Sequence, residues 1–314
     1  MSETLAVDSS AEEVDFLELW LVVWRGKLLI LGVTSIFTAA AIFYALSKPD
    51  IYQATAILAP ASISNTSSLS SLAGQFGGLA SLAGVSLGGA NGGDKSVVAM
   101  ELIKTWGFLE NFINNNHLEV EVFAVKGWNK AKNTLILDDK LYDEETSRWV
   151  RNFDSETKET SAPTSWELFG RIKNRININQ DQKTGLISLS VEHYSPFVAK
   201  EWVDLLVNAI NQHIQAEDKR EAMDSIAYLK EQVNRTSIAE MQTIFYQLIE
   251  EQAKTLMLAE ITSEYVFKTL SPAKVPAVKH KPKRILIVVF GIVMGGFLSV
   301  FFTLVRFYLG KSKG

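Results

Sequence analysis

Two uncharged apolar runs lie near the ends of the chain, at residues 28–46 and 285–305. Each is long enough to cross the hydrocarbon core of a bilayer as a helix, which takes about 20 residues. Two crossings return the chain to its starting side, so the residues between them form one extramembrane body. The predicted segments are a cytoplasmic stretch 1–27, transmembrane helices 28–47 and 285–305, an extramembrane domain 48–284 and a cytoplasmic tail 306–314.

Charges beside the runs predict the orientation. Arg25 and Lys27 precede the first run, whereas Lys48 alone follows it closely. Cytoplasmic flanks are rich in Lys and Arg, so both termini are expected in the cytoplasm and the main domain in the periplasm of a bacterium. Basic residues within 274–284 disagree, but long translocated domains largely escape this rule. An acidic segment precedes the first run, which favours a retained inner-membrane anchor over a cleaved signal peptide.

Between the runs, strand and helix patterns alternate. Short β-branched or alternating runs predict strands, and apolar positions three or four residues apart predict helices. The predicted strands cover 51–58, 120–125, 134–138, 176–178, 186–191 and 265–270. The predicted helices cover 94–113, a segment from Thr164, 196–233 and 238–256. The Ser- and Gly-rich residues 61–93 indicate a partly ordered loop, and 139–163 a polar loop around a short helix.

Local signals define several of these boundaries. Thr164-Ser-Trp-Glu167 and Ser237-Ile-Ala-Glu240 have the residues of a capping box, which satisfies unpaired backbone donors at a helix start. Lys183-Thr184-Gly185 is typical of a β-hairpin turn. The strands 51–58 and 265–270 both adjoin a membrane run, so we expect them to pair.

The longest helical pattern begins at Pro196 and has two apolar stripes separated by a polar waist, residues 215–221. The stripes are Val203, Leu206, Ile210 and Ile214, then Met223, Ile226, Leu229 and Val233. The helix should leave the core at the waist and pair with the next helix in an antiparallel hairpin over about 196–260. The predicted fold class is therefore α+β: a bitopic protein with an α/β base and a protruding helical hairpin.

Composition excludes several classes of function. The net charge of −4 over 314 residues argues against a nucleic-acid partner, and the lack of cysteine excludes thiol chemistry. The four histidines have no metal-ligand spacing, and Gly310-Lys311-Ser312 lacks the upstream glycine of a phosphate-binding loop. No convergent catalytic set is visible. We therefore expect a protein that is not an enzyme, with no cofactor, no metal and no fused kinase domain.

Several ordered motifs carry a resemblance to a known family. They are Asp15-Phe-Leu-Glu-Leu, Trp24-Arg25-Gly26-Lys27, Tyr52-x-Ala-x-Ala-x-Leu-x-Pro60, Gly185-Leu-Ile-Ser-Leu-Ser, Ser195-Pro196, and Ser271-Pro272-Ala with Pro276 and Pro282-Lys283-Arg284. In this order the chain resembles the Wzz-type polysaccharide co-polymerases, the O-antigen chain-length determinants. The resemblance implies ring-like homo-oligomers in the inner membrane that act with a Wzy-type polymerase to set glycan length. The long Ser- and Gly-rich loop 61–93 departs from the pattern, and residues 215–260 are expected to make a shorter hairpin than some relatives have.

Two sets of small or rigid residues are candidates for a role at the membrane. Pro272, Pro276 and Pro282 fix φ and predict a stiff connection into the second run. Gly291 and Gly295 form a GxxxG pair, widened by Gly296, that lets membrane helices approach closely. We expect this face to pack against the first run or a neighbouring subunit, with chance occurrence of glycine as the alternative.

Two charged sets are candidates for contacts with partners. Lys279, Lys281, Lys283 and Arg284 suit phosphates, either lipid headgroups, which we favour, or the diphosphate of a lipid-linked glycan. Glu217, Asp218, Lys219, Arg220 and Glu221 in the waist suit pairing between subunits, although such a run is more often a solvated face.

The combined prediction is an oligomeric inner-membrane scaffold that regulates the length of O-antigen polysaccharide in lipopolysaccharide. The alternative with the same architecture is a capsule or exopolysaccharide assembly and export scaffold that works with a separate cytoplasmic kinase. A membrane-anchored sensor would need an apolar pocket in the base domain, and a tethered hydrolase would need a catalytic set.

Overall fold

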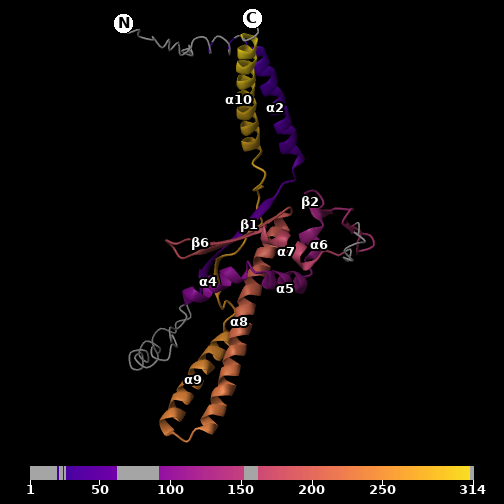
Figure 1. Ribbon diagram of the computed structural model, residues 1–314. Helices are drawn as coiled ribbons and strands as arrows, with labels where there is room; N and C mark the ends of the chain where they lie inside the picture. The colour runs from indigo at the N-terminus through magenta and orange to yellow at the C-terminus, as the bar shows by residue number, and fades with distance from the viewer. Residues whose placement is uncertain (1–19, 21–23, 25, 62–91, 152–161, 312–314) are drawn as a thin grey trace, which may run out of the picture. The chain divides into compact units, whose positions relative to one another are not determined.

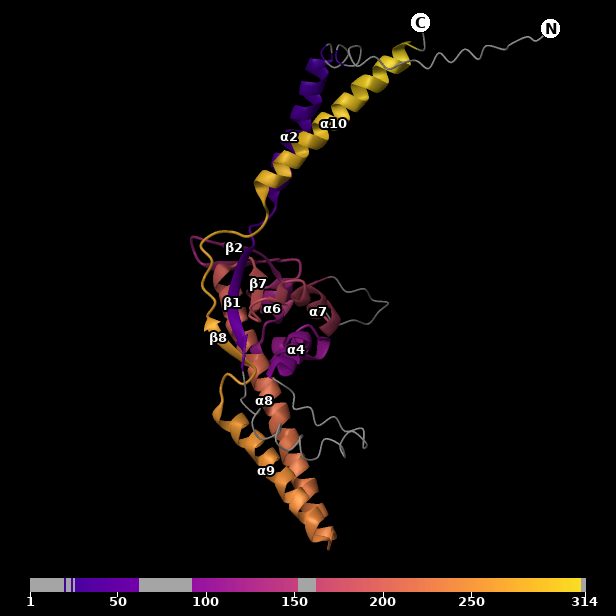
Figure 2. The same cartoon turned by 90° about the vertical axis from the view of Figure 1, so that its left-hand side faces the viewer.

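The computed structural model describes residues 20, 24, 26–61, 92–151 and 162–311. They divide into two compact units, one within 1–49 and 281–314 and the other within 50–280. The first unit contains helices α2 (Lys27–Ser47) and α10 (Arg284–Lys311), which lie side by side in both views (Figures 1 and 2). Both helices are long and apolar enough to cross a membrane, judged by length and composition.

The second unit is built around a four-stranded antiparallel sheet. Its strands are β1 (Tyr52–Pro60), β6 (Ile176–Gln180), β7 (Ile187–His193) and β8 (Phe267–Ser271), in the order β6-β7-β1-β8. The predicted pairing of the first and last strands is therefore confirmed. Ala54, Ala56 and Leu58 alternate into the core, where Ala56 faces Leu189 across the β1–β7 ladder.

Helices of the same unit lie on this sheet or beside it. They are α4 (Gly92–Leu102), α5 (Trp106–Asn116), α6 (Glu119–Phe123), α7 (Ser165–Lys173), α8 (Pro196–Arg235) and α9 (Ala239–Ile261). α8 packs on β1 and β7 through the predicted first stripe, whose four residues are buried. Ser195 caps α8 by accepting from the N–H of Val198, and Pro196 fills the first turn, where its missing donor costs nothing. The α+β class is confirmed.

Beyond the waist, α8 packs against α9 as an antiparallel hairpin (Figure 1). The core cluster ends at Ile214 on α8, which agrees with a helix that leaves the core at the polar waist. The second predicted stripe is partly wrong, because Met223 is exposed and Ala222 is buried in its place. The small Ala222 side chain permits a close approach at the start of the hairpin.

The β6–β7 hairpin and the start of α7 also agree with the sequence signals. Gly185 adopts φ +70°, and the Asp181 carboxylate accepts from the N–H groups of Lys183 and Thr184 to form the turn. Thr164 caps α7 in a complete capping box with Glu167. The second box is wrong: Ile238 is the N-cap of α9 and makes no side-chain cap.

Three further predictions are wrong. The helix expected over 94–113 is two helices, because Thr105 leaves the helical path and caps α5 through the N–H of Phe108. The strand expected at 120–125 is largely helix α6, and a strand pair β2 (Val125–Asn129) and β3 (Thr134–Leu137) follows it. Strands β4 (Tyr142–Asp143) and β5 (Arg148–Trp149) pair within 139–151, the described first part of the segment 139–163 that was expected to be a loop around a short helix. Most of the predicted loop 61–93 lies outside the described residues.

Candidate functional site

The glycines of α10 face α2 at short range. A Cβ atom built on Gly291 would lie 2.5 Å from the Cβ of Ala41, and one built on Gly295 would lie 2.7 Å from the Cβ of Phe37. Real side chains do not approach so closely, so only glycine fits these two positions. A Cβ on Gly296 would meet nothing within 4 Å. Gly291 and Gly295 therefore form the glycine face that packs against α2, and Gly296 does not belong to it.

Hydroxyl groups line the same helix pair. Thr38 donates to the carbonyl of Thr34 on α2, and on α10 Ser299 and Thr303 donate to the carbonyls three and four residues before them. Ser299 and Thr303 are buried. Local bonds of this kind satisfy small polar side chains inside an apolar helix and allow the two backbones to lie close together.

The basic segment before α10 already has partners within its own unit. Lys279 Nζ lies 3.2 Å from Asp50 Oδ1, and His280 Nε2 lies 3.5 Å from Glu192 Oε1. The N–H of His280 donates to the carbonyl of Ile51, which ties this segment to the start of β1. Pro272 and Pro276 lie between β8 and these contacts, on a stretch that is neither helix nor strand.

In the other unit, Arg284 Nε donates to the carbonyl of Ala45 near the end of α2. Pro282 lies two residues before Arg284, and its peptide bond with Lys281 is cis. Two of the four cations predicted to contact phosphate, Lys279 and Arg284, are thus engaged within the chain. Lys281 also has a partner of its own.

The waist of α8 contains a contact within the chain that sequence reasoning missed. The Asp218 carboxylate lies 2.5 Å from Lys95 Nζ and accepts from the hydroxyl of Tyr265 at 2.6 Å. Burial and this hydrogen bond raise the pKa of Tyr265. Among the other candidates, Glu217 lies 3.8 Å from Arg220 on the same helix. Asp218, a candidate for pairing between subunits with a solvated face as the alternative, links α8 to α4 and to the segment before β8.

Asp218 is the last of three polar residues on one face of α8, spaced four and three residues apart. Asn211 Oδ1 accepts from the N–H groups of Val266 and Phe267, and its amide donates to the carbonyl of Phe267. The Gln215 amide donates to the carbonyls of Ala259 and Thr262. We call Asn211, Gln215 and Asp218 the polar ladder. It fixes the chain that returns from the hairpin, and its helical spacing is the signal that could have revealed it.

A second buried polar group lies where β7 joins α8. His193 Nδ1 accepts from the N–H of Ser195, so the proton of the neutral ring is on Nε2, 3.5 Å from the carbonyl of Glu121. Burial, together with the nearby Arg175 charge, lowers the pKa of His193 to about 3. Trp202 donates to the Glu121 carboxylate, whose pKa is raised by burial. His193 is therefore neutral, and its two hydrogen bonds fix the junction of β7 and α8 at the base of the hairpin.

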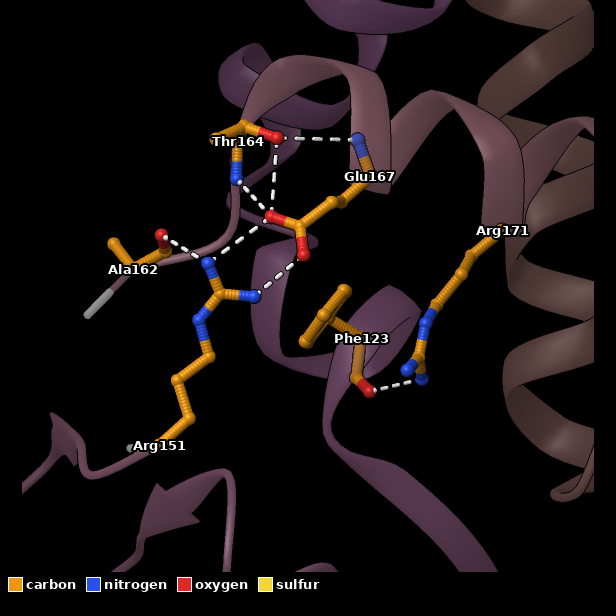
Figure 3. A network of polar contacts seen from close by, with 6 residues as sticks. All are labelled: Phe123, Arg151, Ala162, Thr164, Glu167 and Arg171. Atoms are coloured by element: carbon orange, nitrogen blue, oxygen red, sulfur yellow. Dashed lines mark hydrogen bonds and ion pairs between the residues drawn. The ribbon is translucent and has the colours of Figure 1, made fainter. Parts of the chain in front are cut away.

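The start of α7 is held by a third polar network (Figure 3). Arg151 Nη1 lies 2.6 Å from Glu167 Oε1, and its other terminal nitrogen lies 3.1 Å from Oε2, so the pair is bidentate. The hydrogen bond from Arg151 lowers the pKa of Glu167 to about 2. Arg171, one turn further along, donates to the carbonyl of Phe123 and completes the end of α6. These contacts orient α7 against its neighbours.

Within 26–61, 92–151 and 162–311, no group of three histidine or acidic side chains is placed to hold a metal ion. The polar networks described above join elements of the fold to one another. Their chemistry is that of structural support.

Comparisons with known proteins give one family match, which includes part of this chain. The family model of the Wzz chain length determinant protein matches residues 12–115. Curated protein sequences give no significant match. A solved full-length bacterial polysaccharide co-polymerase is 13% identical with a TM-score of 0.39, covering 95% of this chain and 99% of that one. A fragment of WzzB, a polysaccharide co-polymerase from Salmonella Typhimurium, is 13% identical with a TM-score of 0.28, covering 74% of this chain and 100% of that one.

The family match includes the first apolar run, strand β1 and the helices α4 and α5. TM-scores below 0.5 carry no argument of their own, so the likeness rests on the family model, which matches about a third of the chain. The match over residues 12–115 confirms the resemblance of this chain to the Wzz-type polysaccharide co-polymerases that its ordered motifs indicate.

Proposed function

We propose that the protein regulates the chain length of a bacterial surface polysaccharide, as a non-enzymatic scaffold of the inner membrane. The single observation that carries this proposal is the match of residues 12–115 to the chain length determinant family. The two apolar helices at the ends of the chain support an anchor at both ends. In this proposal the domain 48–284 is periplasmic and the segments 1–27 and 306–314 are cytoplasmic.

The finer proposal names the glycan and the partners. The polysaccharide is the O-antigen of lipopolysaccharide, the elongating enzyme is a separate Wzy-type polymerase, and several copies of this chain form a ring. A lipid-linked glycan and the membrane surface are its further partners. These statements rest on the family resemblance, and the internal contacts of the chain are compatible with them.

A scaffold that sets a length needs a stiff body, and three features supply stiffness here. β1 follows the first membrane run and pairs with β8, which precedes the second. The polar ladder fastens the returning chain to α8. The buried His193 fixes the turn from β7 into α8. A hairpin attached to the sheet at both of its ends would hold its tip at a defined distance from the sheet.

The test is deletion of the gene, followed by electrophoresis of lipopolysaccharide. We expect the modal band of long O-antigen to be replaced by an unregulated ladder, and a plasmid copy of the gene to restore the band. An unaltered ladder would refute the proposal. An unaltered ladder combined with loss of capsule would favour the export scaffold that works with a cytoplasmic kinase.

A further inference from the structure

Three aromatic side chains form a solvent-facing cluster on α5 and α7. The rings of Trp106 and Trp166 stack with centroids 5.4 Å apart and an interplanar angle of 20°. Phe169 meets the ring of Trp166 edge to face at 5.9 Å. Trp166 is 67% exposed and Trp106 is 39% exposed. We call Trp106, Trp166 and Phe169 the aromatic platform.

The backbone under the platform is unusually well fixed for so exposed a residue. Trp166 is the second residue of α7, between the capping residues Thr164 and Glu167. Arg151 clamps the Glu167 carboxylate from a separate segment (Figure 3). Ser165 donates to Glu110 on α5, which joins the two helices that carry the indoles. The platform is thus preorganised, so a ligand would lose little free energy in ordering it.

The fold itself gains little from this arrangement. Trp202 is fully buried and supplies the large aromatic contact of the core, whereas Trp166 leaves most of its indole in water. Burial of apolar area is the main stabilising term in folding, so an exposed indole on a rigid support suggests a role in recognition.

The chemistry around the platform indicates the kind of ligand. The exposed residues of α5 include the amides Asn111, Asn114 and Asn115, and Asn114 lies eight residues after Trp106, roughly 12 Å along the helix. A flat indole matches the C–H face of a pyranose ring, and amides hydrogen-bond to its hydroxyl groups. Among the described residues, Lys173 is a cation in contact with the platform, 5.2 Å from the centroid of the Phe169 ring.

The size of the platform argues against a protein partner. Large aromatic side chains present about 150–250 Å² each. With the exposed fractions above, the platform offers on the order of 300 Å², whereas a stable protein interface buries about 800 Å² per partner. A few sugar residues fit this area.

We infer that the aromatic platform binds a saccharide chain, with the indole of Trp166 under a pyranose ring. This inference rests on the proposed function, because it assigns to that function a surface that touches the growing glycan. Trp166 is then a residue that binds the glycan, whereas the polar networks described above stabilise the fold.

The test uses the full chain in lipid nanodiscs and saturation-transfer-difference NMR. The probe is the surface polysaccharide of the source bacterium, released by mild acid and size-fractionated. We expect transfer to the ring protons of the sugar, and about tenfold weaker binding for Trp166→Ala, equivalent to about 1.4 kcal/mol. Trp166→Phe should retain part of the affinity. The matched control is Tyr246→Ala on α9, an aromatic residue that is 60% exposed and far from α7 in sequence, which should bind as the parent does.

Several results would overturn the inference. They are no transfer in the parent protein, equal affinity for Trp166→Ala, or equal losses for Trp166→Ala and Tyr246→Ala. A Trp166→Ala variant that changes the mass of the assembled complex would assign the platform to contacts between subunits instead. The two proposals fail separately. If deletion of the gene removes the modal band but Trp166→Ala still binds glycan, only this inference fails, whereas an unaltered ladder after deletion refutes the proposed function.

Discussion

Replacing the two close glycines of α10 should separate the membrane helix pair. In the Gly291→Leu, Gly295→Leu variant, the new side chains must occupy space held by Ala41 and Phe37 of α2, whose Cβ atoms lie 2.5 and 2.7 Å from the positions of the first added carbons. Ordinary contact begins near 3.4 Å, so even the first carbon on Gly291 requires a shift of about 1 Å, and a full leucine requires more. The helices must move apart or rotate.

The energy of this change can be bounded. Overpacking in a close contact typically costs about 1–3 kcal/mol. Lipid supplies no hydrophobic drive between membrane helices, so their association depends on close packing and interhelical hydrogen bonds. Two leucines at the closest points of α2 and α10 remove that close packing, and the close α2–α10 pair should no longer be the favoured arrangement.

The chain contains no cysteine, so spin labels can be attached at chosen positions, and pulsed EPR can measure the separation of α2 and α10. Nitroxide labels at Phe43→Cys and Phe290→Cys, both exposed positions, report the distance between the helices in nanodiscs. We expect the double leucine variant to give a longer and broader distance distribution than the parent. The matched control is Gly296→Leu, where an added carbon meets nothing within 4 Å, and its distribution should be unchanged. Equal distributions for all three proteins would refute the argument.

Two further predictions concern the body of the protein. Asn211→Ala should destabilise it by about 2–3 kcal/mol in urea titrations, because two buried N–H groups and one carbonyl lose their partner, whereas the exposed Gln212→Ala should be neutral within about 0.5 kcal/mol. The pKa of His193 is about 3 when folded and about 6.5 when unfolded, so the unfolded chain binds the proton first and stability falls as pH drops from 6.5 towards 3. The thermal midpoint of His193→Asn should fall less steeply over this range than that of the parent, and parallel curves would contradict the assignment.

The parts of the fold that follow from local rules could be predicted from the sequence. Ser195-Pro196 starts α8 and Thr164 with Glu167 starts α7, because each signal satisfies donors that any helix start leaves unpaired. The pairing of β1 with β8 followed from the position of both strands beside the apolar runs. The first apolar stripe of α8, with residues three or four positions apart, correctly predicted the buried face of the first half of the helix.

The errors arise where distant residues override a local preference. Val120 and Val122 favour a strand, but Arg171 donates to the end of α6 and Val122 is buried in a helix. Asp218 lies in a charged run, and only the fold brings Lys95 and Tyr265 to it from elsewhere in the chain. The aromatic platform likewise joins two helices whose tryptophans are 60 positions apart in the chain, so no sequence window contains both.

Single-cysteine labelling in living cells tests the central claim, that both ends of the chain anchor a body outside the cytoplasm. The cysteine-free parent allows one label site at a time: Tyr246→Cys, exposed on the hairpin, and Ser10→Cys, ahead of the first apolar run. With a maleimide that passes the outer but not the inner membrane, we predict that Tyr246→Cys reacts in intact cells and Ser10→Cys reacts only after lysis. Protection of Tyr246→Cys until lysis, or reaction of Ser10→Cys before it, would contradict the account.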